Sequence, residues 1–242
     1  MLKDADRILE GFQDTVRKSL EECGDELEET RQLLHAFLYD FFKTINEYHK
    51  SNPKSIPKYM HSLVFTCFLE LVRISGHIFF LSCNGLYRNA FNDIRYALES
   101  IVQALYIDFR HPEVNIGTKI EILKEVEDKR EYHAIRLIDD LEIDFKGELR
   151  KEYKNLSRII HPSHKQIVRT IKDLKEDTGV PVTIDCEEIP KIRDSTKRMY
   201  DVFFFLFINY FQDFKEVLKK NENFLEKVRI HKLYLLPKIL NV

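Results

Sequence analysis

The segment that most constrains the fold is residues 85–110, which has helical periodicity and is apolar on most sides yet carries one line of polar side chains. These side chains recur at steps of three and four residues, so they share one face of a helix. They are Arg88, Asn92, Arg95, Glu99 and Gln103. Charged groups on a helix this apolar need partners, because a buried charge is stable only when it is paired or hydrogen-bonded. The segment therefore predicts an interior helix whose neighbours supply those partners.

Helical patterns fill most of the remaining chain, and their apolar spacing predicts an all-α, antiparallel bundle of about seven to eight helices. The expected helices cover residues 4–22, 25–50, 57–82, 85–110, 118–143, 148–174 and 192–220. A weakly helical tail follows over 224–239, and the one non-helical stretch, 177–190, is expected to form a flap. We interpret residues 1–56 as an N-terminal two-helix extension and 57–242 as the main bundle.

Composition and charge narrow the functional classes. Hydrophobic residues make up 44% of the chain, which is enough for a sizeable core. The 38 basic and 40 acidic side chains nearly cancel, which argues against a protein held to nucleic acid by its overall charge. The N-terminus lacks the apolar core of a signal peptide, and the apolar stretch 60–83 contains Glu70, Arg73 and His77, which lipid disfavours. We therefore expect no membrane partner.

The cysteines Cys23, Cys67, Cys83 and Cys186 are widely separated, and no two have the spacing of a zinc or redox motif. Cys67 and Cys83 lie in apolar helical patterns, where a buried thiol acts as a small hydrophobe. The cysteine usage fits a reducing compartment, so we expect a cytoplasmic protein with no metal and no cofactor.

A second polar line lies on the expected helix 57–82 and includes Glu70, Arg73 and His77. If this helix and the next form an antiparallel hairpin about residue 84, residues equidistant from the turn lie at the same level. Diagonal pairing then joins Glu70 to Arg95 and Arg73 to Glu99. One interpretation is a buried ion-pair network that fixes helix register. The other is a network that orients or charges an active site.

The polar residues nearest the turn are not assigned to these ion pairs. His77 is expected at the level of Asn92, and Arg88 lies one turn closer to the loop. With their neighbours paired elsewhere, these residues are the ones expected to face a site.

A further polar concentration lies where Pro162 ends or kinks the helix beginning near residue 148. Arg158, His161 and His164 fall within seven residues there. The two histidines and a carboxylate such as Glu99 are one possible metal site, and a purely structural role is a second interpretation. RNA cleavage without a metal is the third, because a neutral histidine transfers protons near neutral pH while an arginine neutralises charge developing on a phosphate.

Two segments together carry a family resemblance: GLYRNAFNDIRYALE, starting at Gly85, and YKNLSRIIHPSH, ending at His164. With the all-helical layout, they resemble the HEPN superfamily, particularly its prokaryotic members. The resemblance implies a metal-independent ribonuclease of toxin or defence systems, or a degenerate relative of one. It assigns Arg158 and His164 to the family's arginine and histidine, with Glu99 or Asn92 as the helper. Ile159, however, stands where active members usually have a polar residue.

The expected partners follow from these observations. The phenylalanine-rich run 202–208 belongs either to the core or to a dimer interface. We expect a homodimer, with RNA and a cognate protein as further partners. A non-enzymatic interaction or scaffold protein, in which the polar line only sets helix register, is the alternative function.

Overall fold

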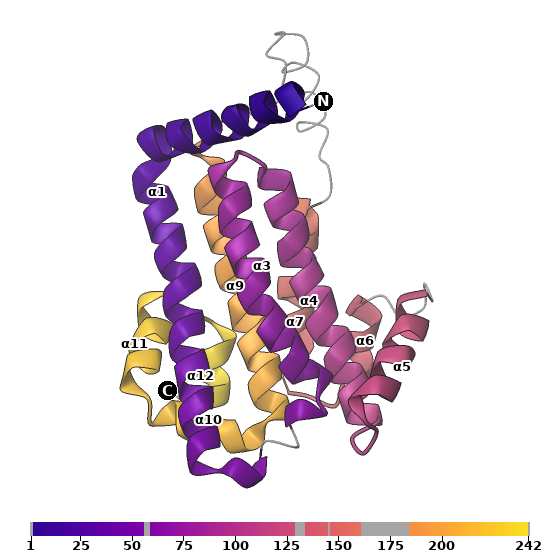
Figure 1. The fold of residues 1–242 in the computed structure, drawn as a ribbon. Helices are drawn as coiled ribbons and strands as arrows, with labels where there is room; N and C mark the ends of the chain where they lie inside the picture. Colours follow the sequence, from indigo (N-terminus) through magenta and orange to yellow (C-terminus); the bar gives the residue numbers. More distant parts are fainter. Residues whose placement is uncertain (1, 56–58, 129–133, 145, 161–183, 242) are drawn as a thin grey trace.

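The computed structural model describes residues 2–55, 59–128, 134–144, 146–160 and 184–241. Within these ranges the chain is all-α and contains no strand, as the periodicity predicts. Long helices stand side by side as a bundle, and shorter helices close its lower end in Figure 1. The elements are α1 (Leu2–Ser51), η1 (Pro53–Ser55), α3 (Leu63–Cys83), α4 (Tyr87–Arg110), α5 (Ile116–Asp128), α6 (Ala134–Asp140), α7 (Lys146–Ile160), α9 (Glu188–Tyr210), α10 (Gln212–Lys219), α11 (Glu222–Ile230) and α12 (Leu235–Leu240).

The expected hairpin between α3 and α4 is confirmed. Gly85 adopts φ 66, a left-handed conformation that glycine takes without steric cost. The Leu86 amide then donates to the Leu81 carbonyl at 2.9 Å, and the Gly85 amide donates to Ser82. This pattern closes the end of α3 and turns the chain directly into α4. In Figure 1, α4 lies between α3 and α7.

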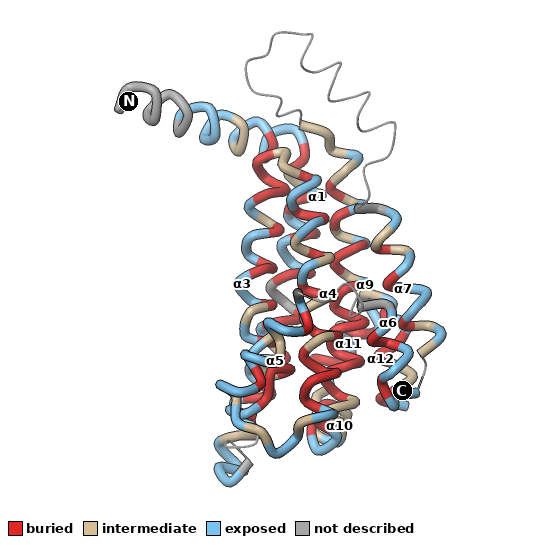
Figure 2. The backbone as a smooth tube through the Cα atoms, turned by 90° about the vertical axis from the view of Figure 1, so that its right-hand side faces the viewer, coloured by how far each residue is buried: buried red, intermediate tan, exposed pale blue. Residues whose placement is uncertain are grey.

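The first helix bends where two helices were expected to meet. Cys23 has non-helical backbone angles inside α1, next to the Gly24 at which the sequence predicts a break. The part of α1 before this kink projects away from the bundle (Figure 2). A disulfide joins Cys23 to Cys186 across 163 residues, a link that the scattered cysteines did not suggest. Such bonds are rare in the cytosol, so the cytoplasmic location stays a prediction that this bond does not support.

Several expected helix bounds were wrong. The third helix starts at Leu63, because the Ser62 hydroxyl accepts a hydrogen bond from the Phe65 amide and caps it there. The described parts of the expected helix 118–143 are α5 and α6, and residues 129–133 between them lie outside the described residues. The expected helix 192–220 is instead two helices, because α9 begins at Glu188 and ends at Tyr210, before α10. Residues 188–190 of the expected flap belong to α9, whereas 177–183 lie outside the described residues. The described part of the helix expected over 148–174 ends at Ile160.

The phenylalanine-rich run forms the centre of the core. Phe203, Phe204, Phe205 and Phe207 are all fully buried within the single chain. Phe41 of α1 lies 4.5 Å from Phe204, measured between ring centroids. The run is therefore core rather than exposed interface, and the part of α1 after the kink packs into the same core as α9.

A buried ion pair joins the end of α4 to the start of α5. Lys119 Nζ lies 2.7 Å from Asp108 Oδ1, and the two side chains are 1% and 0% exposed. The other Asp108 oxygen accepts hydrogen bonds from the Ser62 hydroxyl at 2.7 Å and the Val64 amide at 3.0 Å. Lys119 also donates to the His61 carbonyl at 2.9 Å. These groups, which we call the Asp108 node, connect the beginning of α3 with α4 and α5.

The helix α3 carries exposed apolar side chains, among them Leu69, Val72 and Phe80, in addition to its buried ones. Within the described residues it is the one helix long and apolar enough to cross a membrane, and 39% of its most apolar window is buried. Core helices of proteins that never enter a bilayer pass the same test, so this finding is weak evidence of a span. The absence of a membrane partner stays a prediction.

The Asp108 node should dominate the response of the fold to substitution. Lys119→Met removes the only cation that pairs with the buried Asp108 carboxylate within the described residues, so we expect a loss of about 3–5 kcal/mol in the free energy of unfolding. Urea denaturation of the purified chain measures this loss. Lys124→Met, an exposed change on the same helix, is the control and should cost no more than ~0.5 kcal/mol. Equal losses for the two variants would contradict the role of the node.

Candidate functional site

The middle of the α4 polar line meets α7. Arg95 Nε donates to Glu99 Oε1 at 2.7 Å, one turn away on the same helix. The Tyr153 hydroxyl of α7 donates to the same carboxylate oxygen at 3.0 Å. Burial and the nearby charge of Glu99 raise the pKa of Tyr153 to about 12. The hydrogen bond to Glu99 raises the pKa of the Arg95 guanidinium. Arg95, Glu99 and Tyr153 form what we call the α4–α7 seam.

The predicted pairs between α3 and α4 were wrong. Arg73 pairs with Glu70 on its own helix rather than with Glu99, and Arg95 pairs with Glu99 rather than with Glu70. Partners three or four residues apart are already neighbours on a helix surface, so neither pair needs the other helix. The Arg73 and Glu70 side chains are 70% and 36% exposed. Glu70 and Arg73 therefore form a surface pair and Arg95 and Glu99 a half-buried pair, instead of one buried network between α3 and α4 that fixes register.

A polar contact between α3 and α4 occurs nearer the turn, at His77. His77 Nδ1 lies 2.6 Å from Asp93 Oδ2, which joins α3 to α4. The sequence expected His77 at the level of Asn92, so the hairpin register is confirmed although the partner is the adjacent aspartate. Arg88 and Asn92 are exposed on α4, as expected for residues free to face a site.

The predicted catalytic group is only partly described. Arg158 is exposed in the last turn of α7. It lies five residues beyond Tyr153, which is about 7.5 Å of helical rise from the contact with Glu99. His161 and His164 lie outside the described residues, so their distances from Arg158 stay predictions. Arg158 thus shares a helix with the α4–α7 seam, and its pairing with a histidine is untested.

The metal interpretation can be examined only in part. Within the described ranges, no group of three or more histidine, cysteine, aspartate or glutamate side chains is placed to hold a metal ion. Glu99, the carboxylate considered as a third ligand, is engaged by Arg95 and Tyr153. The remaining candidate ligands are the two histidines outside those ranges.

Sequence reasoning missed two polar features. Asp108 lies in the apolar run YIDFR, and its position as an isolated acid there was the available signal for a buried charge. A basic pocket between α9 and the turn before α12 was also missed, because its lysines are 35 residues apart in Lys197 and Lys232.

Comparisons of the chain with protein-family models, with curated proteins and with solved structures gave no match.

Tyr153 should make folding stability sensitive to alkaline pH. Its pKa is about 12 in the fold against an ordinary value of 10, so its contribution is fully present below pH 10 and is lost as the pH rises toward 12. We expect urea denaturation at pH 9 and pH 11 to show a smaller loss of stability for Tyr153→Phe than for the unaltered chain. The exposed Tyr39→Phe is the control and should lose as much as the unaltered chain. An identical loss in all three proteins would contradict the seam.

Proposed function

We propose that the chain is a HEPN-like, metal-independent endoribonuclease, or a relative that retains the site without the activity. The observation that carries the proposal is the contact between Glu99 on α4 and Tyr153 on α7. The described residues of the two segments that resemble the family lie on or next to these two helices, and the seam joins the helices. Glu99, a helper candidate, thereby contacts the helix that carries Arg158 in its last described turn.

The proposed chemistry assigns one task to each group. His164 takes the proton of a ribose 2′-hydroxyl, whose oxygen attacks the adjacent phosphorus and expels the 5′-oxygen of the next nucleotide. His161 is the second proton carrier and delivers a proton to that leaving oxygen. Arg158 neutralises the charge that develops on the phosphate. Arg88 and Asn92 are exposed polar groups on the α4 side from which RNA would be contacted. Ile159 stands where active family members usually have a polar residue. An inactive relative is therefore the alternative that we propose for this chain.

Cleavage of single-stranded RNA in EDTA tests the proposal. We expect the purified chain to cleave, and we expect Arg158→Ala and His164→Ala each to slow cleavage by roughly 100-fold or more, since each removes a group acting in the transition state. Lys154→Ala, an exposed change of charge on the same helix, is the control and should cleave at the unaltered rate. Equal cleavage by every variant would identify a contaminating nuclease and contradict the assignment.

A second candidate function, a non-enzymatic interaction protein, is favoured by an exposed apolar face on α1 and α3. Its members are Tyr39, Phe42, Leu69, Val72 and Phe80, with Tyr39 70% and Phe80 53% exposed. At these exposures the five side chains present roughly 400 Å² of apolar surface. That is about half of the ~800 Å² per partner in a standard interface, and it is within the range of roughly 300–600 Å² for the largest apolar patch of a typical monomer, a patch that is often functional.

We propose a second copy of the chain as the occupant of this face. A two-fold interface needs a projection and a hollow on one surface. Tyr39 and Phe80 project, and a groove of about 250 Å³ lies beside Gly76, where an added Cβ would touch nothing within 4 Å. The exposed Glu70 and Arg73 add both signs of charge on the same helix, and the formal net charge of −2 gives little repulsion between copies.

Light scattering after gel filtration tests this interface. We expect a dimer for the unaltered chain and a monomer for Phe80→Glu, because the carboxylate would lose its hydration in the contact. Ile230→Glu, an exposed apolar position on α11, is the control and should stay dimeric. A monomeric unaltered chain, or a dimeric Phe80→Glu, would contradict the proposal, as would binding to phospholipid vesicles in place of dimerisation.

A further inference from the structure

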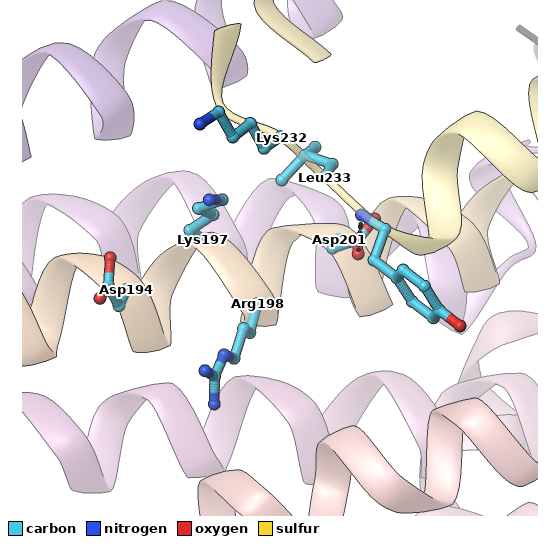
Figure 3. A pocket seen from close by; sticks show the side chains of 7 residues that line it. Asp194, Lys197, Arg198, Asp201, Lys232 and Leu233 are labelled. Atoms are coloured by element: carbon cyan, nitrogen blue, oxygen red, sulfur yellow. Dashed lines mark hydrogen bonds between the residues drawn. The ribbon is translucent and has the colours of Figure 1, made fainter. Parts of the chain in front are cut away.

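A small basic pocket lies between α9 and the turn that joins α11 to α12. Its volume is about 220 Å³, and its lining includes Lys197, Arg198 and Lys232. Figure 3 shows the Lys197 side chain extending from α9 toward the turn that carries Lys232. Arg198 is directed to the other side of α9. Two ammonium groups from segments far apart in sequence are thus brought to one space.

The backbone at Lys232 is unusual for a lysine. It has φ 50, a left-handed conformation that residues with a Cβ rarely adopt. The Lys232 amide donates to the Arg229 carbonyl at 3.0 Å, and the Leu233 amide donates to Val228 at 3.2 Å, so this residue terminates α11. Glycine is the residue normally found at such a helix end. A strained residue that carries a charge into a pocket is a reason to look for a function of its side chain.

Two carboxylates, Asp194 and Asp201, also line the pocket, and neither forms an ion pair with Lys197 or Lys232 among the described residues. Asp201 is buried, and its oxygens accept hydrogen bonds from the Tyr234, Leu235 and Leu236 amides at 2.7–2.8 Å. Asp194 is exposed on α9 and lies apart from the lysines in Figure 3. Within the described residues, no ion pair joins either Lys197 or Lys232 to a carboxylate. A positive space of this kind is suited to an anion.

The positive charge of Lys197 also affects the pKa of a neighbouring histidine. Burial lowers the pKa of His231, and the charges of Lys197 and Lys227 lower it further. Lys227 has Asp40 as a close partner, whereas His231 directly precedes Lys232 in the turn. The field of Lys197 therefore extends into the turn that carries the second lysine.

We propose that this pocket binds the terminal phosphate group of a phosphomonoester. A phosphomonoester carries nearly two negative charges at neutral pH, which matches two lysines that line one pocket better than a carboxylate or an internal phosphodiester does. Lysine serves as a point charge for phosphate and needs no planar, paired geometry. The ligand is either a small phosphorylated metabolite or the 5′-phosphate end of a nucleic acid. This assignment stands independently of the proposed ribonuclease activity.

Calorimetric titration of the full chain tests the pocket with four probes. They are inorganic phosphate, a nucleoside 5′-monophosphate, and one short single-stranded RNA with and without a 5′-phosphate. We expect binding of the monophosphate to weaken by roughly tenfold or more in Lys232→Gly and in Lys197→Gln, since each loses a hydrogen bond to a charged group. Lys54→Gln, an exposed lysine beside α1, is the control with the same change of charge and should bind as the unaltered chain does.

Lys232→Gly separates binding from folding. Glycine suits the left-handed backbone, so this variant should unfold at the same temperature as the unaltered chain or higher while it loses the ligand. Preference for the phosphorylated RNA over the monophosphate would identify a nucleic-acid end as the source, and the reverse would identify a metabolite. Binding that survives both lysine variants, absence of binding by every probe, or detectable binding of the two RNAs with equal affinity would each overturn the proposal.

Discussion

The ion pair between Asp108 and Lys119 is the interaction on which the arrangement of the bundle most depends. A buried carboxylate without a partner is unfavourable in free energy. Asp108 therefore holds in place the groups that pair with it or donate hydrogen bonds to it. These groups come from the segment before α3, from its first turn and from the first turn of α5. At the other end of the hairpin, the left-handed Gly85 fixes the turn. With both ends set, the level of each α4 residue against α3 follows, including the contact of His77 with Asp93.

Periodicity was sufficient to predict the fold class and the α3–α4 hairpin. It was insufficient for the ion pairs, because the same spacing of three and four residues that aligns charges on one face also lets them pair within one helix. Glu70 and Arg73 pair in this way, within α3. The true buried pair was missed because Asp108 follows an apolar run and its lysine lies beyond the end of the helix. The disulfide was beyond prediction, since its cysteines are 163 residues apart and belong to no local spacing motif.

The candidate site was predictable in part for a related reason. The sequence indicated that the polar groups of α4 need partners on other helices. The structure shows one such partner, the Tyr153 hydroxyl of α7, which donates a hydrogen bond to Glu99. Arg158 is on that helix as expected, while His161 and His164 lie outside the described residues. The sequence did not indicate the contact of Tyr153 with Glu99. A tyrosine on the apolar face of a helix is expected to be a core residue, and only the structure shows that its hydroxyl reaches Glu99. The organising helix is therefore a structural spine whose polar groups hold α7 in place, and the proposed chemistry belongs to the end of α7.

The dependence of the bundle on the Asp108 node is tested most directly by a double-mutant cycle on Asp108 and Lys119, with free energies of unfolding measured in urea. We predict that Asp108→Asn and Lys119→Met each destabilise the chain strongly, and that the double variant costs little more than either one, a coupling of about 2 kcal/mol or more. Losses that add to within about 0.5 kcal/mol would show that the two residues act independently and would contradict the central role of the pair.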